Sequence, residues 1–356
     1  MKMIDYICDQ PNRLKKILDS RDDTCIPLLN FIEKNQIKRV YLTGSGTSYH
    51  AALLMKMYFD RYTDFETSVS IPTFFSRYEI LSKNYKKEET MLIAISQSGT
   101  SVSSINAVKK GNLLGIQTVA LTEDLNSLIT SEAKLPIHLN CGKESIPIET
   151  RGYTSTVFTS ILLAVEIGKR IGNLSELDYK AIIELLEMDI SQLPSAIQQI
   201  EEWYRMNKYE LITMEKGAIA GYGYNYVTAM EGYLKMYETF HKPLSAHELE
   251  ELLHGYEMAF DGKQYIFIIA SEGEEVKSID KFRSFLDQLT EHQFVITNQK
   301  INLRSKDLYL STPVSKVFSP ILFILPFQIM AARNCESIGY DTSIYPHKTR
   351  SFSHIR

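Results

Sequence analysis

The feature that most constrains the fold is a pattern that occurs twice in the first half of the chain: a short apolar run, a loop of Ser, Thr and Gly, and then a helical periodicity. Residues 38–44 (KRVYLTG) begin the first occurrence, and a helical pattern covers residues 49–62. Residues 91–95 (MLIAI) begin the second, which continues into a helical pattern over residues 102–114. Two further apolar runs are predicted strands, residues 116–121 and 135–139. Strands that alternate with helices predict a doubly wound parallel sheet of the α/β class.

The second half of the chain repeats this organisation. A polar helical region over about residues 177–206 connects the halves, and residues 217–220 then lead through a Gly-Tyr-Gly loop into a helix around Glu231. The next apolar runs are residues 265–270, 293–297 and 308–310. We therefore predict two tandem α/β domains, residues 1–195 with a helical lead-in through about residue 35, and residues 196–356.

The charge and composition exclude several classes of protein. The formal net charge is −4, so the chain lacks the basic balance of a nucleic-acid-binding protein and no nucleic-acid partner is expected. The four cysteines form no CxxC pair, and the first residues lack the apolar segment of a signal peptide. The most apolar stretch, residues 318–332, is shorter than the roughly 20 residues of a membrane span and is predicted to be a buried helix. We expect a cytoplasmic protein with no membrane partner.

Two hydroxyl-rich loops, each directly after a predicted buried strand, form the candidate binding site. The first holds Ser45, Gly46, Thr47 and Ser48, and the second holds Ser96, Gln97, Ser98 and Ser101. Helix N-termini attract anions, and hydroxyl groups add neutral donors to a phosphate. The alternative is that these residues are ordinary N-caps, the commoner use of a single Ser or Thr at such a place. Two such loops in one domain favour a ligand site.

The kind of phosphate ligand is narrowed by what these loops lack. Tyr49 stands where a dinucleotide fingerprint has its third glycine, and no Gly-Lys-Ser/Thr of a P-loop follows either strand. A sugar monophosphate held by hydroxyls and amides is therefore favoured over a nucleotide.

Several segments together resemble a known family. Residues 41–49 (YLTGSGTSY) and 95–100 (ISQSGT) resemble the two signatures of the sugar isomerase (SIS) domain family. In the second half, residues 221–223, 229–238, 253–255 and 319–328 are similar to the isomerase half of the glucosamine-6-phosphate synthases. The resemblance implies two tandem SIS domains, a homodimer, and a hexose 6-phosphate ligand. It also implies the residues that contact this ligand: Ser48, Ser96, Gln97, Ser98 and Ser101.

Glu231, Lys235 and Glu238 are spaced i, i+4 and i+7, which places them on one face of a helix. Without the resemblance, such a pattern more often indicates a solvated ladder of ion pairs along an exposed helix face than a functional site. The resemblance implies that Glu238 moves a proton between C1 and C2 of the sugar and that His254 assists ring opening, with Glu231 beside the substrate. Lys235 would either stabilise an enolate oxygen or pair with the two glutamates, and both options stay open.

Two further sets of residues were weighed. Lys348 is the candidate for a lysine that the synthases carry in a closing C-terminal loop. His247 and Glu248 suggest a zinc motif, but Glu251 stands where HExxH has its second histidine, so no metal site is expected. No cofactor is expected either.

The chain has no glutaminase half, and residues 149–155 resemble the stand-alone fructosamine-6-phosphate deglycases of the same family. The leading hypothesis is therefore a deglycase that hydrolyses a 6-phosphorylated sugar–amine conjugate. A ketose/aldose isomerase or an amino-sugar-phosphate deaminase is the first alternative. The second is a sugar-phosphate sensor without turnover, although residues 1–37 are too short and not basic enough for a helix-turn-helix.

Overall fold

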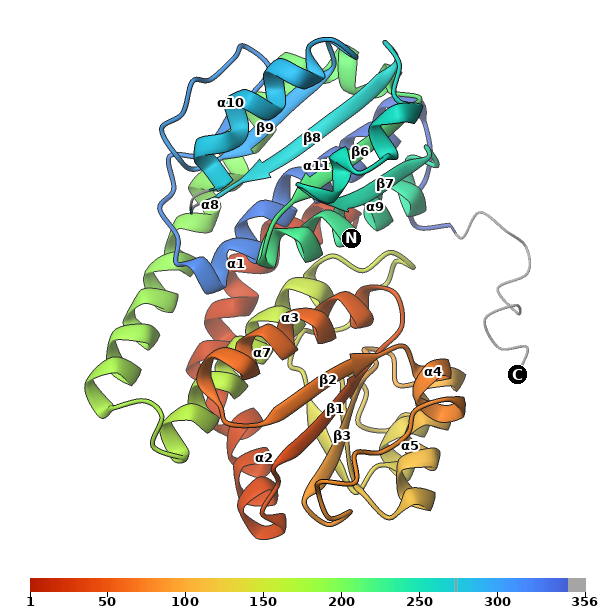
Figure 1. Cartoon of the computed structure of the whole chain (residues 1–356), viewed down its shortest axis with the longest axis vertical. Coiled ribbons are helices and arrows are strands. Elements are labelled where there is room, and N and C mark those ends of the chain that lie inside the picture. The colour runs from red at the N-terminus through yellow and green to blue at the C-terminus, as the bar shows by residue number, and fades with distance from the viewer. Residues whose placement is uncertain (272, 274, 345–356) are drawn as a thin grey trace. The chain divides into compact units, whose positions relative to one another are not determined.

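A computed structural model of the chain describes residues 1–271, 273 and 275–344, and it divides them into two compact units (Figure 1). The first unit consists of Asn12–Ser145 and Arg151–Glu187, and the second of Met1–Pro11, Ile146–Thr150 and Met188–Ile344. Both units are discontinuous in sequence, unlike the contiguous domains expected at residues 1–195 and 196–356. The short pieces belong to the second unit because both bond to its helix Ser319–Ile338: Gln10 donates to Gln328, and Gln328 donates to the carbonyl of Thr150.

The first unit is a five-stranded sheet in which every pair of neighbouring strands is parallel. The strand order is β2 (Glu66–Ser70), β1 (Arg39–Thr43), β3 (Thr90–Ile95), β4 (Gln117–Thr122) and β5 (Leu135–His138). Figure 1 shows α3 (Thr47–Tyr62) and α7 (Arg151–Arg170) on one face of the sheet, with α4 (Pro72–Arg77) and α5 (Val102–Leu114) on the other. The remaining helices are α6 (Leu128–Glu132), α2 (Arg21–Asn35) and α1 (Met3–Asp19), of which residues 3–11 belong to the second unit; α1 and α2 form the predicted helical lead-in. β1 and β3 are buried along their whole length, as expected for strands covered by helices on both faces.

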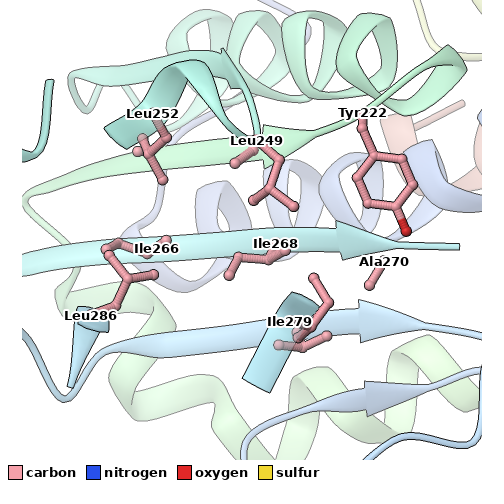
Figure 2. Packing of buried hydrophobic residues seen from close by; sticks show 11 residues of the cluster. Tyr222, Leu249, Leu252, Ile266, Ile268, Ala270, Ile279 and Leu286 are labelled. Atoms are coloured by element: carbon pink, nitrogen blue, oxygen red, sulfur yellow. The ribbon is translucent and has the colours of Figure 1, made fainter. Parts of the chain in front are cut away.

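The second unit contains another five-stranded parallel sheet. Its strand order is β10 (Leu308–Tyr309), β9 (Gln293–Thr297), β8 (Gln264–Ala270), β6 (Lys216–Gly221) and β7 (Leu244–Glu248). Its helices are α8 (Glu176–Thr213, which starts in the first unit), α9 (Tyr224–Thr239), α10 (Glu275–Leu286) and α11 (Ser319–Ile338), with 3-10 turns η1 (Glu251–Leu253), η2 (Tyr256–Ala259) and η3 (Lys316–Phe318). Figure 2 shows the aliphatic core on one face of this sheet, where Ile266 and Ile268 of β8 pack with Ile279 and Leu286 of α10.

The two sheets have the same topology. Counted from the first strand of each unit, both read 2-1-3-4-5, the order of the flavodoxin-like doubly wound fold. Each first strand also leads into its helix through a glycine of unusual geometry: Gly46 precedes α3 with φ 55° and ψ −126°, and Gly223 precedes α9 with φ 56° and ψ −128°. Side chains with a Cβ rarely adopt this conformation. The prediction of two doubly wound parallel sheets flanked by helices is confirmed.

The apolar stretch near the C-terminal end forms part of α11. The segment Lys316–Ile338 is long and apolar enough to cross a membrane, but 94% of its most apolar window is buried inside the protein. The prediction of a buried helix is confirmed, although α11 is longer than the apolar run alone suggested.

Candidate functional site

The two hydroxyl-rich loops lie side by side at the carboxyl edge of the first sheet. β1 and β3 are neighbours, and the loops that follow them lead into α3 and α5. The strand order reverses between β1 and β3, and ligands of open α/β sheets bind outside the strand ends at such a switch point. The structure therefore brings the predicted residues of the first unit to the one edge position where this fold binds ligands.

A chain of hydroxyl contacts joins the two loops. The Ser45 and Ser103 Oγ atoms are 3.3 Å apart, and the Ser103 and Ser101 Oγ atoms are 3.2 Å apart. Ser104 donates to Ser101, and the Ser98 and Thr100 hydroxyls are 3.0 Å apart. Sequence reasoning missed Ser103 because this residue lies inside the helical pattern and not in the loop. Its first-turn position on α5, two residues after Ser101, was the available signal.

Two of the predicted residues occupy the N-cap positions at the two helix starts, but without the side-chain hydrogen bond of an ordinary N-cap. The N-cap residues are Gly46 for α3 and Ser101 for α5, and neither makes a side-chain capping hydrogen bond. Ser45, Gly46 and Ser98 are exposed, and Thr47, Ser48 and Ser101 are half-buried. A cluster of accessible hydroxyls at two helix N-termini is suited to an anion such as a phosphate.

Gln97 is held differently from its neighbours. It is buried, its carbonyl accepts from the Thr122 hydroxyl, and its side-chain amide lies against Gly152 in the first turn of α7. A Cβ at position 152 would come within 2.0 Å of the Gln97 Oε1 atom. Gly152 is therefore required for this placement of Gln97, a contact between residues 55 positions apart that sequence reasoning did not predict.

The acid–base residues of the second unit lie on α9. Lys235 Nζ is 2.6 Å from Glu238 Oε2 and 3.3 Å from Glu231 Oε1, and it donates to the Glu149 carbonyl at 3.0 Å. The side chains of Lys235 and Glu231 are 1% and 0% exposed, whereas that of Glu238 is 35% exposed. A solvated ladder of ion pairs is excluded, because two of its three members are buried.

Burial alone would favour neutral Lys235, but the carboxylates of Glu238 and Glu231 outweigh this effect and hold the pKa of Lys235 above its ordinary value. The residue is therefore a permanent cation. An ammonium group has three N–H donors, and three protein oxygens lie around it. This geometry favours the pairing role of Lys235 over direct contact with an enolate oxygen.

His254 lies on a separate, exposed turn between η1 and η2. The Glu248 carboxylate accepts from the main-chain N–H groups of Glu250 and Glu251 and so shapes the start of this turn. His247 is in a different environment: it is buried, its Nε2 is 2.7 Å from the Ser245 hydroxyl, and burial lowers the pKa of His247. The structure thus groups Glu231, Lys235 and Glu238 on α9 and places His254 on a different element, while Lys348 lies outside the described residues.

The fold and these two groups of residues define the chain as an α/β protein with two doubly wound parallel sheets and a candidate anion site at a sheet switch point. Residues 35–166 match the sequence model of the SIS domain. That match covers the first sheet and its loops.

Other proteins are similar to this chain over most of its length. A glutamine–fructose-6-phosphate aminotransferase (isomerizing) of Pyrococcus horikoshii is 27% identical over 339 residues, which are 92% of this chain and 54% of that protein. The chain spans about half the length of the curated relatives that it matches. A crystal structure described as a candidate phosphosugar isomerase of Clostridium difficile 630 has a TM-score of 0.89 at 25% identity and covers 99% of this chain and 98% of its own. The C-terminal domain of a glucosamine-fructose-6-phosphate aminotransferase of Francisella tularensis has a TM-score of 0.84 at 19% identity, with 96% and 97% of the two chains covered. This last likeness concerns the fold alone.

Proposed function

We propose that the chain is a phosphosugar-processing enzyme, a deglycase that hydrolyses a 6-phosphorylated sugar–amine conjugate to a hexose 6-phosphate and a free amine. The observation that carries the proposal is the half-exposed carboxylate of Glu238, held through one oxygen by the buried ammonium of Lys235. A carboxylate beside a permanent cation stays in place while it exchanges protons with a substrate carbon.

Each group of residues has a role in this reaction. The hydroxyl loops with Gln97 would bind the 6-phosphate, and His254 would exchange protons with the ring oxygens. Glu238 would take the proton from C1 of the open-chain conjugate and return it to C2. The product of this shift is an imine, which water hydrolyses. Lys235 would act as a positioning residue that fixes the Glu238 carboxylate.

Fructoselysine 6-phosphate and glucoselysine 6-phosphate are the substrates for a direct test, with the released hexose 6-phosphate as the measured product and glucose 6-phosphate expected from fructoselysine 6-phosphate. Glu238→Gln should lower turnover at least about 100-fold, the usual contribution of a general base. Glu202→Gln, a change at an exposed glutamate of α8, is the matched control and should keep full activity. Absence of turnover of these and related conjugates, together with identical behaviour of wild type and Glu238→Gln, would refute the deglycase.

The named activity of the aminotransferase relatives supports a second candidate. The same residues would serve a ketose/aldose isomerase or an amino-sugar-phosphate deaminase, because both reactions also move a proton between C1 and C2. Fructose 6-phosphate with ammonia, and glucosamine 6-phosphate alone, are the discriminating substrates. Turnover of these and not of the conjugates would favour the second candidate.

A further inference from the structure

The turn that carries His254 is fixed more firmly at its start than at its end. Leu252 of η1 is fully buried in the aliphatic core of the second unit (Figure 2). After His254 the main chain bends at Gly255, which has a φ of 107°, and enters η2. The four residues of η2 are exposed or half-buried. Burial therefore holds the chain just before His254 much more than the chain just after it.

His247 supplies a contact on the less buried side of this turn. The ring centroids of His247 and Tyr256, the first residue of η2, are 4.3 Å apart, and the ring planes make an angle of 55°. His247 is buried on β7, which pairs with β6, and its Nε2 is 2.7 Å from the hydroxyl of Ser245. Ser245 lies two positions earlier on the strand and therefore on the same face. The sheet and this hydrogen bond thus fix the ring that Tyr256 contacts.

The environment of His247 is suited to packing and not to proton exchange. Burial lowers the pKa of His247, so its ring is neutral near neutral pH. A neutral imidazole has one N–H donor and one acceptor nitrogen, and either can pair with the hydroxyl of Ser245. His254, by contrast, is exposed. The two histidines, seven positions apart, therefore suit different roles.

We propose that His247 is a positioning residue for His254: it holds Tyr256, and Tyr256 fixes the end of the turn on which His254 lies. This inference rests on the proposed role of His254 in ring opening and not on the identity of the released amine. Tyr256 follows His254 by two residues, so a displacement of η2 also moves the main chain of His254. A misplacement of about 1 Å can lower a catalysed rate about 100-fold. Glu238 lies on another element, α9, so the contact concerns ring opening and not proton transfer between C1 and C2.

Ring opening can be measured separately from the rest of the reaction. The two furanose anomers of fructose 6-phosphate interconvert only when the ring opens, and no carbon-bound proton moves in this exchange. NMR follows the exchange rate directly. The wild-type protein should accelerate the exchange, and His254→Asn should remove the acceleration.

The contact is tested from both of its sides. Tyr256 is 54% exposed and tolerates truncation, so Tyr256→Ala should fold and should lower the acceleration about tenfold or more. His247→Ala should lower it by a similar factor, and His247→Phe, which keeps an aromatic ring against Tyr256, should restore most of the loss. Met258→Ala is the matched control, because Met258 belongs to the same η2 and is 86% exposed, and it should keep the wild-type exchange rate.

A double-mutant cycle distinguishes positioning from a general loss of structure. If His247 acts through Tyr256, the double alanine variant should lose no more than the larger of the two single losses, whereas independent effects would multiply. The affinity for fructose 6-phosphate, measured by calorimetry, should stay at the wild-type value, because the hydroxyl loops of the first unit would bind the phosphate.

Several results would decide against the proposal. Wild-type exchange by His247→Ala or Tyr256→Ala would overturn it, and so would losses that multiply in the double variant. If the wild-type protein does not accelerate the exchange, His254 does not open the ring and the inference fails with that role. If it accelerates the exchange and the two alanine variants lose this effect, but no conjugate is hydrolysed, the deglycase function fails and the role of His247 stands.

Discussion

Replacing Lys235 with methionine should destabilise the second unit severely, because the change leaves the fully buried carboxylate of Glu231 without its counter-charge. At the observed separation of 3.3 Å and an effective dielectric constant of about 20, the two charges attract by about 5 kcal/mol. Removal of one partner of a buried ion pair typically costs about 3–5 kcal/mol, and we expect Lys235→Met to lie in this range. Adding Glu231→Leu removes the stranded charge and should recover at least about half of the loss.

Urea denaturation followed by tryptophan fluorescence measures this effect in the relevant unit. The chain has one tryptophan, Trp203, which is buried in the second unit with its ring edge-on to Phe294. Lys216→Met is the control, because Lys216 forms a more exposed ion pair with Asp261 and should cost at most about 1 kcal/mol. If Lys235→Met costs no more than this control, or if the double variant is no more stable than Lys235→Met alone, the buried charge pair is not the source of stability and the reasoning is refuted.

Three further predictions concern other parts of the protein. Burial raises the pKa of Asp189 to about 6, so the ionised carboxylate destabilises the folded state above that pH. Asp189→Asn should therefore stabilise the protein at pH 7 by up to about 3 kcal/mol. This gain should shrink as the pH falls towards 4, and a gain independent of pH in urea titrations would contradict the assignment. Gly152→Ala should displace Gln97 and weaken fructose 6-phosphate binding, measured by calorimetry, by about tenfold or more, while the unfolding midpoint changes less. An unchanged affinity would show that Gln97 does not contribute to the binding site. If each active site of the homodimer implied by the family resemblance takes Glu238 from one subunit and His254 from the other, mixing inactive Glu238→Gln and His254→Asn subunits should restore activity. No recovery after verified subunit exchange would place both residues of one site in one subunit.

The interior strands of both sheets were predictable from the sequence, and one edge strand of each was not. β1, β3, β6, β8 and β9 are apolar runs, since helices cover both faces of a parallel sheet. β2 (ETSVS) and β7 (LSAHE) carry mainly polar and small residues and occupy the same edge position in the two sheets. An edge strand is partly exposed, so its sequence does not show the continuous apolar run by which the other strands were found.

Some features of the candidate site were likewise predictable from the sequence, and others were not. The hydroxyl loops, and the common helix face of Glu231, Lys235 and Glu238, were predictable because each is a local pattern. The burial of Lys235 and its bond to Glu149 were not, because they depend on the packing of a distant segment against α9. Local spacing identifies residues that share a face, but it cannot tell whether water or another part of the chain covers that face.

The matching bends at Gly46 and Gly223 have a consequence for how such a chain can acquire new activities. Both units possess the same main-chain path from first strand to first helix, but Ser45, Thr47 and Ser48 flank the first bend, and Tyr222, Tyr224 and Asn225 flank the second. The second unit thus has the same main-chain bend with different side chains around it, and Asn225 there donates to Ser271. A repeated scaffold of this kind lets the loops of one unit bind a ligand while the same bend in the other unit carries different side chains.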